Sequence, residues 1–495
     1  MPAERPPPGT GVEHLFHPKG VAVVGASRTP GKVGYTILYN LKLSYRGPVY
    51  PVNPRAREIL GLPAYPSILE VPDPVDLAAI AVPAPVVPRV LEEAGRRGVK
   101  AAIVYSGGFK EVGEEGARLE RQLVEIARRY GMRILGPNCV GIYSPVSGLN
   151  ATFLDPSRQG FPEAGHIALV SQSGALGIAL LDWMESRGLG VSRFVSVGNK
   201  ADIDEADLLA FLSKDRHTYV VAMYVEGVDD GPRFRRALEE TTTVKPVAVL
   251  KAGKTSEGAR AAASHTGSLA GSYEVYRAVF RQTGVVEAES SDDLFDLVLA
   301  LAYQPPMRGD RVAVVTVGGG SGVMATDYLL QLGLKVPELS AETQRRLRQV
   351  LLSIASPRNP VDVTGSGNEQ HLAESMRIVA ESGEVDAILL IPYFTVPSIS
   401  AKAPEVLAQA IHEVQVEHGL PVVVSLTGGT RAWLMARRLF DLVKTPIYLS
   451  EARAARALWA LKVYGEWLRR QGVLEERLEE HRRRMVALWG AVRRM

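Results

Sequence analysis

One pattern recurs along most of this chain and limits the folds open to it. A short run of apolar, mostly β-branched residues is followed by a turn that contains Gly or Ser, and then by a longer amphipathic segment. The first example is the run 20–25, after which a turn leads to a helix expected to begin at Gly34. Such alternation is typical of strands and helices arranged around a parallel sheet. The pattern therefore predicts an α/β fold.

The first series of this pattern supplies enough strands for a complete domain. A stretch rich in Pro, Gly and Ser, residues 144–165, has no helical period, and we expect a domain boundary there. The predicted strands before it are 20–25, 49–52, 77–82, 101–105 and 133–135, and the clearest predicted helices are 86–97 and 117–130.

Two further series and a tail follow. A second punctuated linker, residues 303–310, separates the two series. After Glu451 the chain becomes rich in Ala, Leu, Arg and Glu, and its apolar positions predict a helix that docks on the body. In that tail the run 482–484 is basic but follows two glutamates, which favours a solvated helix face over a nucleic-acid contact. The predicted strands are 166–171, 193–197, 219–225 and 246–251 in the second series, and 312–317, 387–391 and 422–425 in the third; the apolar tail positions are Leu458, Leu461, Val463 and Trp467.

Length and composition agree with a multidomain globular protein. At roughly 150 residues per domain, 495 residues correspond to about three domains. The 57 basic and 54 acidic residues give a net charge of +3, so no global field gathers nucleic acid or anionic membrane. The single cysteine, Cys139, forms no intrachain disulfide, and no apolar run reaches the roughly 18 residues of a membrane span. We expect a soluble protein of the reducing cytoplasm, without a nucleic-acid or membrane partner.

The turn after the first predicted strand, residues 25–34, favours phosphate binding. Its glycines and the following helix start present backbone N–H groups to an anion. It is not a G-x-G-x-x-G fingerprint, and the second strand ends in Val52-Asn53-Pro54 without the carboxylate that holds a nicotinamide ribose. Dinucleotide binding is disfavoured, whereas phosphate binding and a turn without any ligand both stay open.

Five short runs in the first series resemble a known domain. In their order they are similar to the CoA-binding domain of the nucleoside-diphosphate-forming acyl-CoA synthetases, a superfamily that includes succinyl-CoA synthetase and ADP-forming acetate–CoA ligase. The resemblance continues through the later series to about residue 460. The runs are Val21 to Ser27, Tyr50 to Pro54, Val82 to Ala84, Ser106 to Phe109 and Gly136 to Gly141.

The resemblance implies both a domain plan and a CoA site. It implies a Rossmann-like CoA-binding domain (12–148), two flavodoxin-like parallel-sheet domains (149–305, carrying the phosphohistidine, and 306–460) and a C-terminal helical tail (461–495). CoA is expected at the carboxyl ends of the first domain's strands. Cys139 is expected to be structural. The residues nominated for CoA are Gly25, Ser27, Lys32, Asn53, Pro54, Val82, Pro83, Ser106, Gly107 and Asn138.

One of the nine histidines, His265, lies in a run of small residues from Ala262 to Gly271, which predicts a loop that can move. A lone histidine is more often structural, but this run resembles the superfamily's phosphohistidine loop. Neutral imidazole is a nucleophile near pH 7, and its phosphoramidate can pass a phosphoryl group to ADP. The resemblance assigns Glu226, after the strand 219–225, to orient this histidine; an ordinary strand-end glutamate is the alternative.

Two helix starts are predicted to hold phosphate. Residues 170–177 form a strand end, a small turn and a helix start, where free N–H groups and hydroxyls can bind oxygens. Residues 317–322 repeat this design in the third series and resemble a second phosphate-facing helix, although the usual Asn-Ala-Gly-Gly opening is altered. The candidate phosphate ligands are Ser171, Ser173 and Gly174 in the first motif, and Gly319, Gly320 and Ser321 in the second.

The resemblance implies the alpha subunit of an ADP-forming acyl-CoA synthetase of the acetate–CoA ligase type. Phosphate would convert acyl-CoA to acyl phosphate and CoA, His265 would take the phosphoryl group and release the acid, and ADP would become ATP. The chain contains no ATP-grasp unit and no Walker motif, so ADP, ATP and Mg²⁺ are expected on an ATP-grasp beta subunit in an α2β2-type assembly, with no metal site here. The alternatives are a non-catalytic CoA-binding regulator, part of a protein acyltransferase system and, more weakly, an NAD-linked oxidoreductase.

Overall fold

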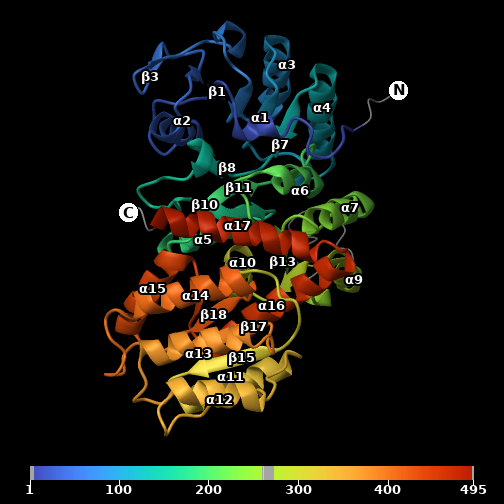
Figure 1. Cartoon of the computed structure of the whole chain (residues 1–495). Coiled ribbons are helices and arrows are strands. Elements are labelled where there is room, and N and C mark those ends of the chain that lie inside the picture. The colour runs from blue at the N-terminus through green and yellow to red at the C-terminus, as the bar shows by residue number, and fades with distance from the viewer. Residues whose placement is uncertain (1–4, 259, 261–271, 493–495) are drawn as a thin grey trace. The chain divides into compact units, whose positions relative to one another are not determined.

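The computed structural model describes residues 5–258, 260 and 272–492, and divides into two compact units, Met1–Ser291 and Asp292–Met495. The first unit contains two large sheets and the second contains one (Figure 1). The predicted α/β fold with parallel sheets and a helical C-terminal region is confirmed.

The first sheet contains five parallel strands in the order β2-β1-β5-β6-β7. Their near-continuous burial explains why the strands read as apolar runs. The chain continues from β1 to β2 in one direction across the sheet and from β5 to β6 and β7 in the other, so the strand order reverses between β1 and β5. Doubly wound sheets bind ligands at such a point. The elements are α1 (Glu13–Phe16), β1 (Val21–Val24), α2 (Val33–Ser44), β2 (Val49–Val52), β3 (Glu58–Ile59), β4 (Leu62–Pro63), β5 (Leu77–Ile80), α3 (Val87–Arg97), β6 (Ala101–Val104), α4 (Glu114–Tyr130) and β7 (Arg133–Leu135), with short 3₁₀ turns at Ile68–Glu70, Ala84–Val86 and Lys110–Val112.

The second sheet contains seven strands in the order β14-β13-β12-β10-β11-β8-β9. Five are parallel, and the pair β8 and β9, which the sequence did not predict, adds antiparallel to β11 at one edge. The elements are β8 (Gly141–Ser144), a 3₁₀ turn (Pro145–Ser147), β9 (Leu149–Thr152), β10 (Ala164–Ser171), α5 (Gly174–Ser186), β11 (Val191–Ser196), α6 (Glu205–Lys214), β12 (Val220–Val225), α7 (Gly231–Thr242), β13 (Val247–Lys251), α9 (Tyr273–Thr283) and β14 (Val286–Ala288).

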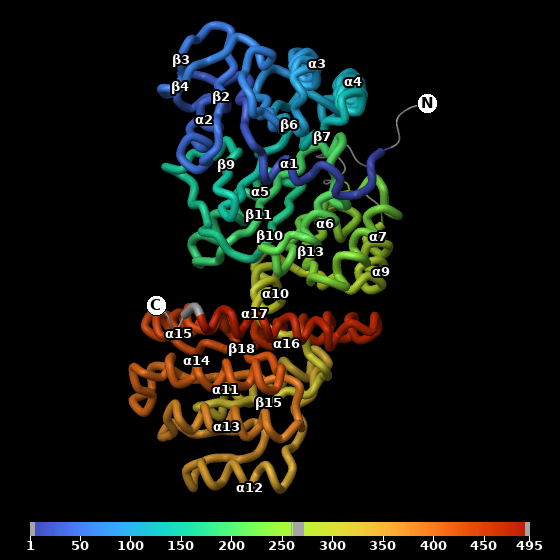
Figure 2. The backbone as a smooth tube through the Cα atoms, turned by 45° about the horizontal axis from the view of Figure 1, so that its top comes forward, coloured from blue at the N-terminus to red at the C-terminus, as the bar shows by residue number. Residues whose placement is uncertain are grey.

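The two sheets of the first unit share one hydrophobic core. Residues of the first sheet such as Val23 and Leu77 belong to the same buried cluster as Val170 and Met223 of the second. Strand β9 also packs on α2, as Figure 2 shows. This shared core fixes the carboxyl ends of the two sheets relative to one another within the unit.

The second unit contains a five-stranded parallel sheet in the order β16-β15-β17-β18-β19. Helix α13 packs on α14, and α11 packs on α16, so helices form two layers over the sheet. The elements are α10 (Ser291–Tyr303), β15 (Val312–Thr316), α11 (Gly319–Gln331), α12 (Ala341–Val350), β16 (Val361–Asp362), α13 (Glu369–Glu381), β17 (Ala387–Ile391), α14 (Ala403–Glu413), a π-helical turn (Val414–His418), β18 (Val422–Ser425), α15 (Thr430–Val443), β19 (Ile447–Tyr448), α16 (Glu451–Arg470) and α17 (Leu474–Val492).

The tail docks on the third sheet, as predicted. Leu458, Leu461 and Trp467 of α16 are buried, and α16 packs on β18 while α17 packs on α15 and α16. In the basic run of α17, Arg482 and Arg483 are exposed and lie near Glu479, which fits the predicted solvated face. Among the residues described, we find no helix with both the length and the apolar character of a bilayer span.

Buried His481 in α17 should make the second unit sensitive to acid. Burial, with the nearby Arg484 charge, lowers the pKa of His481 to about 3. The unfolded imidazole binds a proton below about pH 6.5 and the folded one does not, so stability falls as the pH drops from 6.5 toward 3. At pH 5 this pKa difference lowers the free energy of unfolding by about 2 kcal/mol.

Between pH 7 and pH 5 the free energy of unfolding of His481→Leu should therefore fall by about 2 kcal/mol less than that of the parent chain, as measured by urea unfolding. An unchanged pH dependence would refute this role for His481.

Candidate functional site

The predicted phosphate motif and Glu226 meet at the reversal point of the second sheet. Strands β10 and β12 are neighbours and parallel, so their carboxyl ends share one edge. Ser171 ends β10 and the turn to α5 follows it, whereas Glu226 comes directly after β12. In open parallel sheets this is the position at which ligands bind. The topology thus juxtaposes two motifs that are over 50 residues apart.

A cavity of about 300 Å³ opens at this edge. It receives residues from the second sheet and also from loops of the first domain. Predicted candidates from three groups meet in it: Glu226, the phosphate motif and a CoA candidate. The lining residues are Tyr105, Lys110, Glu111, Asn138, Cys139, Val140, Phe153, Gln172, Ser173, Gly174, Ala175, Gly198, Asn199, Lys200 and Glu226.

Glu226 is held from several sides and is only 6% exposed. The Oε1 atom of Gln172 accepts hydrogen bonds from the backbone N–H groups of Glu226, at 2.6 Å, and Gly227, at 3.0 Å. Lys251 Nζ donates to the backbone carbonyl of Glu226 at 2.8 Å. Burial, together with the charge of Glu226 and a hydrogen bond to it, raises the pKa of Tyr224 to about 12. Gln172 and Lys251 therefore fix the backbone of Glu226 at the cavity wall, and Tyr224 contacts its carboxylate.

The start of helix α5 presents backbone donors to the same cavity. Ser173 caps the helix, and its Oγ accepts a hydrogen bond from the N–H of Leu176 at 3.3 Å. The other N–H groups of a first helical turn lack intrahelical partners and suit an anion. Ser173 and Gly174 line the cavity, whereas Ser171 is fully buried and donates its hydroxyl to the Ser173 carbonyl at 2.6 Å. Ser171 therefore stabilises the turn and does not line the cavity.

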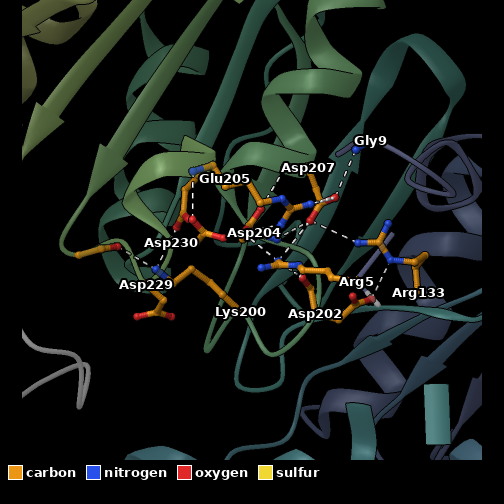
Figure 3. A network of polar contacts seen from close by, with 12 residues as sticks. Arg5, Gly9, Arg133, Lys200, Asp202, Asp204, Glu205, Asp207, Asp229 and Asp230 are labelled. Carbon is orange, nitrogen blue, oxygen red and sulfur yellow. Dashed lines mark hydrogen bonds and ion pairs between the residues drawn. The ribbon is translucent and has the colours of Figure 1, made fainter. Parts of the chain in front are cut away.

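Lys200 supplies a positive charge to the cavity that Glu226 also lines. Its Nζ lies 3.1 Å from Glu205 and donates to the carbonyl of Gly227 at 2.8 Å; Figure 3 shows Lys200 and Glu205 in this network. Burial lowers the pKa of Lys200, but Glu205 and Asp229 raise it more, so the pKa lies above its ordinary value. Lys200 is therefore protonated at neutral pH.

A chain of hydrogen bonds connects the cavity to the first domain. Asn138 Nδ2 donates to Asn199 Oδ1 at 3.3 Å, and Asn199 Nδ2 donates to Glu111 at 2.6 Å and to Glu120 at 2.9 Å. Glu111 in turn accepts from the N–H of Gly108 at 2.6 Å. This chain positions the loop after β6, which contains predicted CoA residues, against the second domain.

The other CoA candidates lie in turns at the carboxyl ends of β1, β2, β5 and β6, outside the cavity lining. Neighbouring turns are tied together: Asn53 Nδ2 donates to the carbonyl of Ala26 at 2.8 Å, and the hydroxyl of Ser106 donates to the carbonyl of Val82. Ser27 Oγ accepts from the N–H of Thr29 at 3.0 Å.

Backbone approach is close at the reversal point of this sheet. Gly25 has a φ of +86°, and a Cβ on Gly34 would lie 2.0 Å from the Gly25 carbonyl oxygen. Only glycine fits there, so α2 begins directly over the strand end. Lys32, Pro54, Pro83 and Gly107 are exposed around this turn. The exposed, glycine-lined edge fits a large phosphate-bearing ligand such as CoA.

Three family models match the chain in succession. They are described as CoA binding domain (residues 19–145), Succinyl-CoA ligase like flavodoxin domain (164–301) and Ligase-CoA domain (312–471). The acetate–CoA ligase [ADP-forming] I subunit alpha of Pyrococcus furiosus is 44% identical over 466 residues, in a match that covers 92% of this chain and 98% of that one. The chain belongs to the NDP-forming acyl-CoA synthetase family. The predicted resemblance is thereby confirmed.

Other relatives of this acyl-CoA synthetase family member are longer, or have been solved as structures. The acetate–CoA ligase [ADP-forming] I of Archaeoglobus fulgidus is 45% identical, and the match covers 94% of this chain but only 65% of that relative's length. An acetyl-coenzyme A synthetase 1 of Ca. Korarchaeum cryptofilum, described as dinucleotide forming and solved in complex with phosphate and ADP, is 38% identical with a TM-score of 0.84. That match covers 93% of this chain and 98% of the solved chain.

In this family member, the predicted nucleophile His265 lies outside the described residues. The predicted phosphate residues Gly319, Gly320 and Ser321 begin α11 in the second unit, at the reversal point between β15 and β17. Ser321 Oγ lies 2.6 Å from the hydroxyl of Tyr393, and Gly320 faces open space. Their binding of phosphate stays a prediction.

Several cavity residues escaped the sequence-based prediction. Gln172, Asn199 and Lys200 each follow directly after a strand or its turn, and this position was the available signal. Cys139 was predicted to be structural; it is buried, and burial raises the pKa of its thiol to about 12. Tyr105 and Phe153 carried no signal, because an aromatic residue at a strand end usually belongs to the core.

Proposed function

We propose that this chain is the alpha subunit of an ADP-forming acyl-CoA synthetase of the acetate–CoA ligase type. One observation carries the proposal: the 300 Å³ cavity brings together Glu226, the α5 start at Ser173 and Gly174, and Asn138 of the first domain. A phosphorylation centre and a CoA-binding domain need to meet in this way if phosphate is to attack a thioester.

The proposed reaction has two steps on this chain. A phosphate oxygen, held by the α5 start, attacks the thioester carbonyl; the carbon–sulfur bond breaks, and CoA leaves as acyl phosphate forms. A ring nitrogen of His265 then attacks phosphorus, and the bond to the carboxylate oxygen breaks, releasing the acid. Glu226 accepts a hydrogen bond from the other ring nitrogen and so keeps the attacking nitrogen unprotonated.

Several contacts support these roles. Lys200 is protonated, lines the same cavity as Glu226 and would offset part of the charge that phosphate brings there. The donors at the α5 start belong to a helix anchored in the sheet, so they are preorganised. The sheet that carries the CoA turns shares one hydrophobic core with the second sheet, which fixes the CoA turns and the phosphate site relative to one another.

The proposal places ADP, ATP and Mg²⁺ on a separate ATP-grasp beta subunit. The name of the Pyrococcus relative, a subunit alpha of nearly the same length, supports a divided enzyme. The longer Archaeoglobus relative has room for further segments in one chain.

The test is ATP formation from acetyl-CoA, phosphate and Mg²⁺-ADP, with this chain alone and together with a copurifying ATP-grasp chain. We expect ATP only from the pair. Formation of ATP by this chain alone would refute the assignment of nucleotide binding to a separate subunit. Absence of ATP from the stable pair would refute the proposed activity.

A further inference from the structure

A second cavity, of about 660 Å³, lies at the other end of the strand that leads to Glu226. Its lining comes from residues 8–17 and from residues 210–217, the end of α6 and the loop that follows. That loop comes before β12, whereas Glu226 comes directly after it. The 6 residues of β12 span roughly 20 Å at about 3.3 Å each. This cavity therefore takes no part in the reaction proposed above.

The N-terminal segment that lines this second cavity is fixed to the body. The N–H of Gly9 donates to Asp207 Oδ1 at 3.2 Å, as Figure 3 shows, and the carbonyl of Thr10 accepts a hydrogen bond from Arg133. Phe16, at the end of this segment, and Leu212 of α6 belong to the same hydrophobic core. The cavity is thus built into the fold of the first unit.

The lining contains two cations that are not already paired. Lys214 and Arg216 are exposed, and neither forms an ion pair within the described part of the chain. The buried acid of the lining, Asp215, is neutralised from inside the fold by Arg193, whose Nε lies 3.2 Å away. The other acid, Glu13, is 55% exposed and remains hydrated. Two free cations therefore face one solvated carboxylate, which favours an anionic ligand.

Two imidazoles add hydrogen-bond donors to the lining. Arg193 lies 3.2 Å from His17 Nε2, and Arg216 Nε donates to His217 Nε2 at 3.2 Å. Because a guanidinium can only donate, both Nε2 atoms accept, and each neutral ring carries its proton on Nδ1. Among the described residues neither Nδ1 has a hydrogen-bond partner. Both N–H groups are therefore available to an acceptor such as a phosphate oxygen.

The end of α6 does not oppose an anion strongly. The carboxyl end of a helix carries a partial negative charge on its last carbonyl groups. Here Lys245 Nζ donates to the carbonyls of Leu212, at 2.7 Å, and Asp215, at 2.5 Å. This buried lysine compensates the helix end from the side of the core.

An aromatic ring lies next to the free cations. Phe211 and Lys214 are three residues apart on α6, so they share one face of the helix, and both line the cavity. The ring of Phe211 stacks on Phe16, with centroids 4.8 Å apart, yet it stays partly exposed. Pro8 and Ala210 add further carbon surface. The cavity thus combines anion-binding groups with a surface on which a planar group can stack.

We propose that this second cavity binds a small phosphate-bearing molecule of the nucleoside monophosphate class. Lys214 and Arg216 hold the phosphate, with the two imidazole N–H groups as further donors, and the base stacks on Phe211. The volume of the cavity lies within the range of small-molecule sites, about 300–1,000 Å³.

The test is calorimetric titration of the full chain with AMP, adenosine and inorganic phosphate in a phosphate-free buffer. We expect AMP to bind more tightly than either of the other two. Lys214→Ala and Arg216→Ala should each weaken AMP binding about 10-fold or more, because each removes a charged hydrogen bond to phosphate. Phe211→Leu should weaken AMP binding about 10-fold and leave phosphate binding unchanged.

Two control variants place the binding on the chain. Lys100→Ala removes an exposed lysine outside the lining, and its affinity for AMP should equal that of the parent. Lys32→Ala alters the predicted CoA turn and should also leave AMP binding unchanged. Because Lys214 and Arg216 are exposed, their variants should keep the urea midpoint of the parent.

Four results would overturn the proposal. The first is a loss of AMP affinity in Lys32→Ala but not in Lys214→Ala or Arg216→Ala, which would place AMP in the CoA site. The second is equal binding of AMP and adenosine, which would remove the role of the cations. The third is equal binding of AMP and inorganic phosphate, which would remove the role of Phe211. The fourth is absence of AMP binding to the parent chain.

Discussion

Glu226→Gln is expected to slow transfer of labelled phosphate from solution to this chain, in the presence of acetyl-CoA, by about 10²–10⁴-fold. The substitution keeps the size of the side chain but removes the charge that would stabilise the histidine while it attacks. It can also present an N–H group to the ring and so favour the wrong tautomer.

The surroundings of Glu226 make this a clean experiment. Its backbone is held by Gln172 and Lys251 rather than by its own carboxylate, so the turn after β12 should persist in the variant. Glu289→Gln is a suitable control, because Glu289 is exposed and paired with Lys254 at 2.9 Å. A Glu226→Gln rate within twofold of the parent would remove Glu226 from the mechanism.

Asp207→Asn should lower the free energy of unfolding of the first unit by about 2–3 kcal/mol. Asp207 is fully buried at the start of α6, 2.9 Å from Arg233 and 3.3 Å from Arg133 of the first domain. It also lies 3.4 Å from Arg5, and its Oδ1 accepts from the N–H of Gly9 at 3.2 Å, as Figure 3 shows. The variant would remove one of the two carboxylates that each of these arginines contacts. Arg133 would keep Asp202, and Arg233 and Arg5 would share Asp204, so the buried positive charge would be less well compensated, which is costly.

This carboxylate is ionised in the folded protein. Burial raises the pKa of Asp207, but the charges of Arg133 and Arg233 lower it by a larger amount, so the pKa lies below its ordinary value. The stabilisation is therefore present above the unfolded pKa, near 4, and is lost as the pH falls through the folded pKa. Urea unfolding at pH 7 measures the effect.

Glu114→Gln is the control for this prediction. Its ion pair with Arg121 is short, at 2.9 Å, but the Glu114 side chain is 86% exposed, and such pairs contribute less than about 1 kcal/mol. An equal loss in both variants would show that burial of Asp207 does not matter.

Strand positions were predictable from the sequence, because parallel strands are buried on both faces and appear as apolar runs. The runs 101–105 and 133–135, for example, became β6 and β7 with nearly the same bounds. The motif after β10 and Glu226 after β12 were also placed at strand ends correctly, since the strand itself fixes where the turn begins. Topology then explains their meeting, because β10 and β12 are neighbours in the sheet.

The rest of the site depends on tertiary contacts that local sequence does not encode. Strands β8 and β9 are short and lie in a stretch rich in turn residues, and they form only because β11 offers an edge. Phe153 follows β9, so its place in the cavity could not be predicted without that pair. Asn199 gains significance from Glu111, a partner 88 residues away in another domain. Lys200 gains significance from the carbonyl of Gly227, which follows a different strand, β12.

The most direct test of the central claim is phosphorylation of this chain at His265. The chain alone is mixed with acetyl-CoA and labelled phosphate, and acid-labile label on the protein is measured for the parent and for His265→Ala. We predict label on the parent, dependent on acetyl-CoA, and none on the variant. Equal labelling of His265→Ala, or no labelling of the parent, would contradict the proposed phosphohistidine mechanism.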